Sequence, residues 1–309
     1  MLIKRLSGLV AGVFLAGIVC ILASACAEQS SVKLLELNRQ IVVLETGEEY
    51  ELKVSILPTE CADSAEWSSS DESVVTVAGG LLRAAGEGEA LITVTAGTKS
   101  ASCSVTVVDD CVRVDSVESL RAAAEQLEEG DVILLEGGTY KLNRCLTLRD
   151  LSQVMFIGEE GVVIEKSDDV WSVSDGDCFS LLALIDCADV RLRNLTISGA
   201  RSPEETEPAA CGIRAVRSTF SLENVTASES EGAGIALVDS SGSLRGVETQ
   251  DNAGGGVFLG GESGSVLTVQ GCKFYEETPV FCFDTDVNSR VEGAGESSMQ
   301  DGVRIWSFS

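Results

Sequence analysis

The sequence contains no histidine, so its chemistry must come from arginine, lysine, carboxylate and thiol side chains. Ser-His-Asp triads, Cys-His pairs and histidine metal ligands are therefore excluded. A lysine or arginine can serve as the base of a polysaccharide lyase if an acid or a calcium ion neutralises the uronate. The candidate catalytic residues for such chemistry are Arg191, Arg193, Arg217 and Arg245.

These arginines belong to a pattern of alternating charge. Arg191 and Arg193 flank an apolar leucine and should point outward from a strand. At the repeat spacing described below, one column stacks Arg193, Glu223, Arg245 and Gln270. Opposite charges along such a ladder pair with each other in solvent and contribute about 0.2–1 kcal/mol per pair. Residues 112–309 carry 15 basic against 34 acidic residues, a formal charge of -19, whereas a lyase for polyanions needs a basic groove. We therefore predict a self-paired face and no catalysis, with a polysaccharide lyase as the alternative.

Residues 32–108 contain short segments in which apolar and polar residues alternate, separated by turns, as in Leu52, Val54 and Ile56. This pattern predicts a small β-sandwich with Trp67 between its sheets. Four stretches resemble the bacterial Ig-like group 2 domain: Trp67–Asp71, Val74–Val77, Gly80–Leu82 and Gly88–Val94. The resemblance implies a spacer or adhesion module without catalytic residues. Cys103 is expected to be a core thiol, with a Cys61–Cys103 bridge as the alternative.

Residues 112–309 show an internal repeat of 22 residues. Gly212-Ile213, Gly234-Ile235 and Gly256-Val257 recur at this spacing, and so do Leu222 and Leu244. A fixed period of short apolar pairs predicts a solenoid of about six coils stacked at about 4.8 Å. The fold class is therefore all-β: an Ig-like sandwich plus a short right-handed parallel β-helix.

A capping helix should precede the coils. Asp115 with Glu118 predicts the helix cap, and apolar residues from Leu120 to Leu127 have helical spacing. This helix and the sequence EGDVILLEGGTY at 129–140 resemble the amino-terminal cap and first coil of pectin-lyase-like β-helix proteins. The resemblance implies proteins that cleave or bind polysaccharides. Residues 302–309 give no clear second cap.

Carboxylates offer little support for a hydrolase or a metal site. The hydrolases of the resembled superfamily carry Asn-Thr-Asp and Asp-Asp motifs on adjacent coils, whereas this chain has only Asp168-Asp169 and Asp284-Thr285-Asp286. Asp239, Asp251, Asp284 and Asp286 lack calcium-loop spacing. We predict no cofactor and no metal site; Ca²⁺ is the one ion with suitable ligands, and no motif supports it.

Other polar and aromatic residues have simpler structural explanations. Asn194 and Asn224 match the N-glycosylation pattern, but a left-handed turn conformation accounts for both. Aromatic side chains that could stack on sugar rings are expected to pack in the core or at the ends: Tyr140, Trp171, Tyr275 and Trp306.

The first 25 residues have the features of an export signal. Lys4 and Arg5 precede the uncharged stretch 6–25, which ends in small residues before Cys26. This end resembles the lipobox of bacterial lipoproteins, although Ala23 stands where that family most often has leucine. The resemblance implies lipidation at Cys26 and a tether over 26–31. Cleavage without lipidation and an uncleaved membrane anchor are the alternatives.

These observations predict an exported cell-envelope protein, anchored to the bilayer through its N-terminus with its domains outside the cytoplasm. The formal charge of -27 excludes nucleic acid as a partner. The predicted function is adhesion or glycan binding, with a polysaccharide or another surface protein as partner. A polysaccharide lyase and a purely structural envelope protein are the alternatives.

Overall fold

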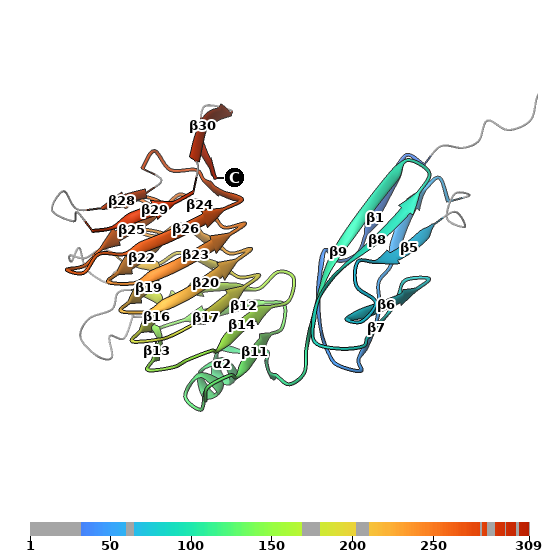
Figure 1. The fold of residues 1–309 in the computed structure, drawn as a ribbon, viewed down its shortest axis with the longest axis horizontal. Coiled ribbons are helices and arrows are strands. Elements are labelled where there is room, and N and C mark those ends of the chain that lie inside the picture. The colour runs from blue at the N-terminus through green and yellow to red at the C-terminus, as the bar shows by residue number, and fades with distance from the viewer. Residues whose placement is uncertain are drawn as a thin grey trace, which may run out of the picture.

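The computed structural model describes residues 32–59, 65–168, 180–201, 210–278, 280–282, 288–293, 295–300 and 303–308. It confirms the predicted all-β fold, with an Ig-like sandwich followed by a parallel β-helix. Figure 1 shows the two parts side by side, the sandwich in blue and teal and the coils running from green to red.

The sandwich is built from nine short strands: β1 (Leu34–Leu37), β2 (Ile41–Glu45), β3 (Glu49–Glu51), β4 (Val54–Leu57), β5 (Glu66–Ser69), β6 (Val75–Ala78), β7 (Leu81–Ala84), β8 (Gly88–Ala96) and β9 (Lys99–Val108). They form sheets in the orders β2-β9-β8-β5, β3-β7-β6 and β1-β4. Trp67 packs against both apolar clusters of the sandwich, as predicted, although it is only half-buried.

Cys103 is a free, fully buried thiol, which confirms the predicted core role. Burial raises its pKa to about 12, so the thiol stays protonated and unreactive. Cys61 lies outside the described residues.

The β-helix has three parallel sheets, which we call A, B and C. Sheet A comprises β10 (Val112–Val114), β11 (Val132–Leu135), β14 (Met155–Gly158), β17 (Val190–Arg193), β20 (Thr219–Glu223), β23 (Ser241–Arg245), β26 (Val266–Gln270) and β29 (Arg290–Glu292). Sheet B comprises β12 (Thr139–Leu142), β15 (Val163–Lys166), β18 (Thr196–Ser198), β21 (Thr226–Ser228), β24 (Glu248–Gln250) and β27 (Cys272–Phe274), followed by the antiparallel β31 (Val303–Phe308) and β30 (Gly295–Gln300). Sheet C comprises β13 (Leu146–Arg149), β16 (Ser180–Ile185), β19 (Cys211–Val216), β22 (Ile235–Val238), β25 (Val257–Gly260) and β28 (Val280–Cys282). One strand from each sheet makes a coil, so β11 to β28 form six complete coils, as predicted.

The register confirms the predicted apolar columns. Leu222 pairs with Leu244, and Ile213, Ile235 and Val257 pair in succession. These side chains belong to one continuous buried cluster that runs through the coils. Each coil is too small to bury its own apolar face, so the hydrophobic contribution of about 1.5–3 kcal/mol per large side chain arises only on stacking.

The turns between strands repeat from coil to coil. Asn194 and Asn224 have φ angles of 56° and 52°, so the predicted left-handed conformation is confirmed. The Asn224 Nδ2 donates a hydrogen bond to the Asn194 Oδ1 at 3.3 Å. The N–H of Gly255 donates to the Asn252 oxygen at 3.0 Å and closes the turn at Ala253 and Gly254.

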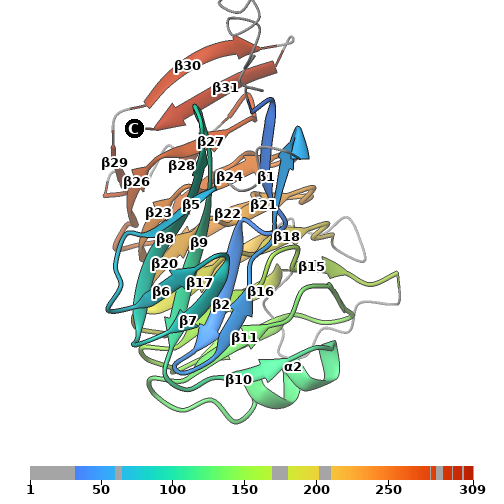
Figure 2. The same cartoon turned by 90° about the vertical axis from the view of Figure 1, so that its right-hand side faces the viewer.

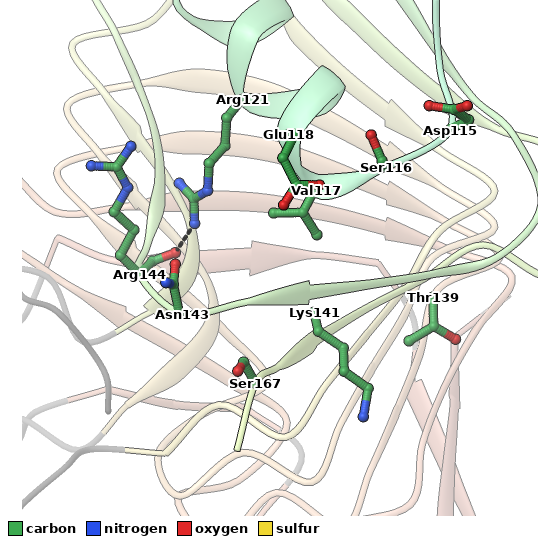
Figure 3. A pocket seen from close by; sticks show the side chains of 10 residues that line it. All are labelled: Asp115, Ser116, Val117, Glu118, Arg121, Thr139, Lys141, Asn143, Arg144 and Ser167. Carbon is green, nitrogen blue, oxygen red and sulfur yellow. Dashed lines mark hydrogen bonds between the residues drawn. The ribbon is translucent and has the colours of Figure 1, made fainter. Parts of the chain in front are cut away.

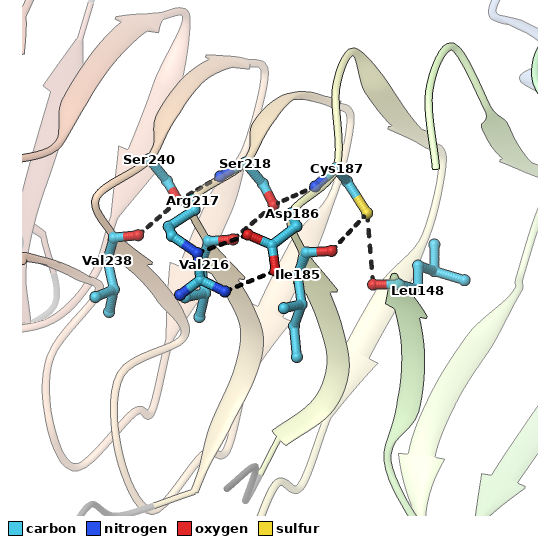
Figure 4. Close-up of polar contacts among 9 residues, drawn as sticks. All are labelled: Leu148, Ile185, Asp186, Cys187, Val216, Arg217, Ser218, Val238 and Ser240. Atoms are coloured by element: carbon cyan, nitrogen blue, oxygen red, sulfur yellow. Dashed lines mark hydrogen bonds and ion pairs between the residues drawn. The ribbon is translucent and has the colours of Figure 1, made fainter. Parts of the chain in front are cut away.

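A polar ladder stabilises the turn that leads from sheet C to sheet A (Figure 4). The backbone N–H of Cys187 donates to the Ser218 Oγ at 3.0 Å, and the N–H of Ser218 donates to the Ser240 Oγ at 3.0 Å. In the next coil, the N–H of Ser240 donates to the Ser265 Oγ at 3.1 Å. The ladder satisfies buried backbone donors that the sheets do not pair.

The capping helix α2 (Val117–Ala124) lies over the first coil, but the predicted cap residues are wrong. Ser116 is the N-cap and Ser119 completes the capping box. The N–H of Ser116 donates to the Ser119 Oγ at 3.1 Å, and the N–H of Ser119 donates to the Ser116 Oγ at 3.2 Å, so the two serines satisfy each other's backbone donors. Leu120 is fully buried against the coils, as its spacing predicts.

The carboxyl end has a cap that sequence reasoning missed. The hairpin of β30 and β31 pairs antiparallel with β27 and closes sheet B. The ring of Phe308 lies 5.0 Å from that of Phe274, between centroids. This pairing covers strand groups that would otherwise be an open edge.

The sandwich contacts the outer side of sheet A (Figure 2). Val43 of β2 packs against Leu134 and Ile157, with Cys111 alongside. Arg113 of β10 binds Glu45 at 2.9 Å and Glu48 of the sandwich at 2.8 Å. Apolar and charged contacts therefore join the two parts in addition to the chain connection.

Candidate functional site

The outer side of sheet A carries the predicted charged ladder. Its register places Arg193 beside Glu223, Glu223 beside Arg245, and Arg245 beside Gln270. The predicted stacking is confirmed. The same column begins with Arg113 and continues through Leu134 and Ile157, which the sandwich covers.

Arg193 is held between the two parts of the molecule. Its Nη2 forms a close ion pair with Glu89 of β8, and its Nε lies 3.0 Å from the Glu223 Oε2. The contact with Glu223 is an ion pair without good hydrogen-bond geometry, because Nε has no hydrogen-bond partner. Its side chain is only 12% exposed, so a substrate would have to displace the sandwich to reach it. The alternating pattern of the sequence predicts a solvated face for Arg193, and it gives no indication of the ion pair with Glu89.

Arg191 and Arg217 each form a bidentate pair. Arg191 bonds Asp189 at 3.2 and 2.9 Å, and Arg217 bonds Asp186 at 2.6 Å through two nitrogens (Figure 4). These carboxylates raise the pKa of both guanidiniums, and Arg217 in turn lowers the pKa of Asp186. A base must lose its proton, so these pairs oppose the role that a lyase would require.

The four candidate arginines do not share one site. Arg191, Arg193 and Arg245 are spread along the outer side of sheet A, whereas Arg217 lies in the turn from sheet C to sheet A. Arg245 is exposed beside Glu223 and Gln270. The structure therefore brings together no constellation of base, acid and substrate groove from these residues.

A hollow that sequence reasoning missed lies beneath the capping helix (Figure 3). It has a volume of about 700 Å³. Its wall is formed by helix α2 and the two residues before it, by β12 and the bend after it, and by the residue after β15: Asp115, Ser116, Val117, Glu118, Arg121, Thr139, Lys141, Asn143, Arg144 and Ser167. The Arg121 Nη2 donates to the backbone oxygen of Arg144 at 2.8 Å, which fixes the guanidinium at the wall. In the sequence, the feature that indicates this hollow is the pair of cations Lys141 and Arg144, which lie on either side of the inward Leu142.

A second hollow, of about 450 Å³, lies beside the turn at Asp251–Gly255. Glu276 in its wall is buried, and its carboxylate accepts from the Thr249 Oγ1 at 2.6 Å and the Asn252 Nδ2 at 2.7 Å. Asn252 also accepts from the N–H of Ser230 at 3.0 Å, so the carboxylate is part of a network that joins three coils. These bonds explain how an acid is accommodated in the stack.

The aromatic candidates for sugar stacking that the structure describes lie in the core or in the wall of a hollow. Tyr140 is buried, and its hydroxyl donates to the Val114 oxygen at 2.7 Å, which fits the predicted core role. Trp306 is half-buried against the core. Tyr275 lines the second hollow. Outside the described residues lie Trp171, Asp169, Asp284, Asp286 and Cys26.

Within the described ranges, no group of three or more cysteine and carboxylate side chains is arranged to hold a metal ion. Asp239 and Asp251 are in left-handed turn conformations on successive coils at different corners. The predictions on cofactors and calcium therefore remain predictions.

The comparison with protein families identifies the amino-terminal part. Residues 31–107 match the family described as bacterial Ig-like domain (group 2), which confirms the resemblance drawn from Trp67–Asp71 and its neighbours. Domains of this family are common in bacterial surface proteins. No curated protein matches the chain. Among the residues that the structure describes, no helix is long and apolar enough to cross a bilayer.

Proposed function

We propose that this protein is a non-catalytic binding protein displayed on the bacterial surface, in which the β-helix binds a glycan. The observation that carries the proposal is the pairing of the candidate arginines. Arg191, Arg193 and Arg217 are each neutralised by a carboxylate of the same chain, and they lie apart. Arginines paired in this way keep their protons, so they suit reversible polar contact with a polymer better than proton abstraction.

The sandwich supports this proposal through its family and its contacts. Bacterial Ig-like domains of this group occur in extracellular bacterial proteins. The Val43 cluster and the Arg193–Glu89 pair fix the β-helix relative to the sandwich. A spacer that is docked in this way holds a binding surface at a defined orientation from its anchor.

The anchor in this proposal is a lipid on Cys26, inserted in the bilayer and followed by the short tether 26–31. The likeness of residues 112–309 to pectin-lyase-like proteins adds polysaccharide as the ligand class. Another surface protein as ligand, a lyase and a purely structural role are the competing functions.

The test is to screen the purified protein on an array of neutral and acidic polysaccharides. The same polysaccharides are then incubated with protein and calcium, and ultraviolet absorbance is followed for unsaturated products. We expect saturable binding to at least one glycan and no product. Product formation that disappears in Arg193→Ala or Arg245→Ala would establish a lyase instead. Absence of binding across the array would refute the glycan ligand.

A further inference from the structure

The hollow beneath the capping helix differs from the arginine pairs in how its cations are balanced. Arg191 and Arg217 each meet a carboxylate in bidentate geometry. Arg121 donates only to a backbone oxygen, that of Arg144, and forms no ion pair with any residue in the described part of the chain. Its guanidinium therefore retains donors that face no carboxylate.

Arg121 and Arg144 also repel each other. Burial lowers the pKa of Arg121 most, and the positive charge of Arg144 lowers it further. Figure 3 shows the two side chains on the same side of the hollow. Arg144 has a carboxylate partner in Glu125, but its Nη2 lies 3.9 Å from the Glu125 Oε1, and the Glu125 side chain is largely exposed. The one carboxylate that pairs with Arg144 is thus held loosely and in contact with solvent.

The other charged groups around the hollow form no ion pair with Arg121. Lys141 is the third cation, and its Nζ lies 3.2 Å from Glu165. Asp115 accepts a hydrogen bond from the Oγ of the capping residue Ser119 at 3.2 Å. Glu125 and Glu118 act on Arg121 only over distances too long for an ion pair. Among the described residues that line the hollow, Arg121 is therefore the cation without a paired carboxylate, which favours an anionic ligand at this point.

We propose that this hollow binds a compact oxyanion, namely a sulfate, phosphate or carboxylate group, between Arg121 and Arg144. Guanidinium groups present paired N–H donors that match the oxygens of these anions. The negative charge of the bound anion would lie between the two guanidinium groups and reduce their mutual repulsion. At about 700 Å³, the hollow is larger than one oxyanion and also accommodates a small molecule that carries the group. This inference does not depend on the glycan function proposed above.

The test is isothermal titration of the purified protein with sodium sulfate and with sodium phosphate, against sodium chloride at equal ionic strength. We expect saturable binding of at least one oxyanion. Arg144→Gln keeps the backbone oxygen that holds Arg121 in place, and it should weaken binding by about tenfold or more. Arg245→Gln is the matched control, because it removes the same charge from the exposed ladder, and it should leave the affinity unchanged.

A second variant, Arg121→Lys, keeps the charge but loses the paired donors, and we expect weaker binding than in the unchanged protein at a temperature where urea denaturation shows both to be folded. A sulfated and an unsulfated monosaccharide then distinguish the source of the group: tighter binding of the sulfated sugar than of free sulfate identifies a carried group, and equal binding identifies the free ion. The proposal is overturned if neither oxyanion binds saturably, or if Arg144→Gln binds as tightly as the unchanged protein. It is also overturned if Arg245→Gln weakens binding equally, since that indicates general charge screening.

Discussion

The outer side of sheet A is used in two ways along its length. On its first coils the outward residues Leu134 and Ile157 are fully buried, because the sandwich covers them through Val43. On later coils the same column becomes Glu223, Arg245 and Gln270, and it faces solvent. Arg193 lies at the boundary and pairs with a carboxylate on each side.

Backbone register alone therefore does not decide whether a β-helix face contacts another domain or faces solvent. The spacing of strands is the same in both halves, so the side chains determine whether the face becomes an interface or a solvated ladder. An arginine that looks like a catalytic candidate from its exposed column can instead be part of a contact between domains.

The largest effect is expected for Leu134→Asp. A carboxylate at this fully buried position would have no partner and would lose the apolar contacts of Val43 and Ile157. We expect the free energy of unfolding to fall by about 3 kcal/mol or more, as measured by urea denaturation. The matched control is Ser243→Asp on the exposed half of the same sheet, with a change within about 0.5 kcal/mol. Equal losses in the two variants would show that the halves do not differ.

A smaller effect is expected for Arg193→Ala. The substitution leaves Glu89 and Glu223 facing each other across the interface without a cation. We expect a loss of about 1–3 kcal/mol in the free energy of unfolding. A double-mutant cycle with Glu89→Ala isolates the contact between the domains. A coupling energy of zero would mean that this ion pair does not contribute to docking.

Acidification should loosen the interface at Glu45. Hydrogen bonds from Arg113 and then Cys111 lower the pKa of this carboxyl below its ordinary value of 4.5. A lowered pKa in the folded state stabilises the protein above the ordinary value, and the contribution is lost as the pH falls through the lowered one. The loss in stability between about pH 5 and pH 3 should therefore be smaller in Glu45→Gln than in the unchanged protein. The control is Glu36→Gln, an exposed residue of β1, whose acid sensitivity should match that of the unchanged protein.

The smallest effect is expected for Arg245→Ala. Its side chain is exposed in the solvated half, where ladder pairs contribute little. The free energy of unfolding should change by less than about 0.5 kcal/mol, and less still at high salt. A loss as large as that of Arg193→Ala would place Arg245 in a buried contact.

The sequence predicts those features that repeat. The 22-residue period places Leu222 beside Leu244, and the turn asparagines Asn194 and Asn224 occur at equivalent positions. Alternation within a strand separates inward from outward residues, so the charged ladder was also predictable. These features depend on local geometry and on identical neighbours in the next coil.

Features that depend on a single tertiary contact were not predictable. The pairing of Glu89 with Arg193 joins residues about a hundred positions apart in different domains, and no periodicity relates them. The hollow at Arg121 and Arg144 arises from how the capping helix lies on the first coil. The closing hairpin pairs antiparallel, so its residues fall outside the parallel repeat.

Small-angle X-ray scattering of the purified protein tests the docked arrangement most directly. We expect the scattering of a single rigid particle in which the sandwich and the β-helix are docked. This scattering should remain the same in Arg245→Ala, and the particle should expand in Leu134→Asp. Scattering from the unchanged protein that requires two independently moving domains would contradict the account.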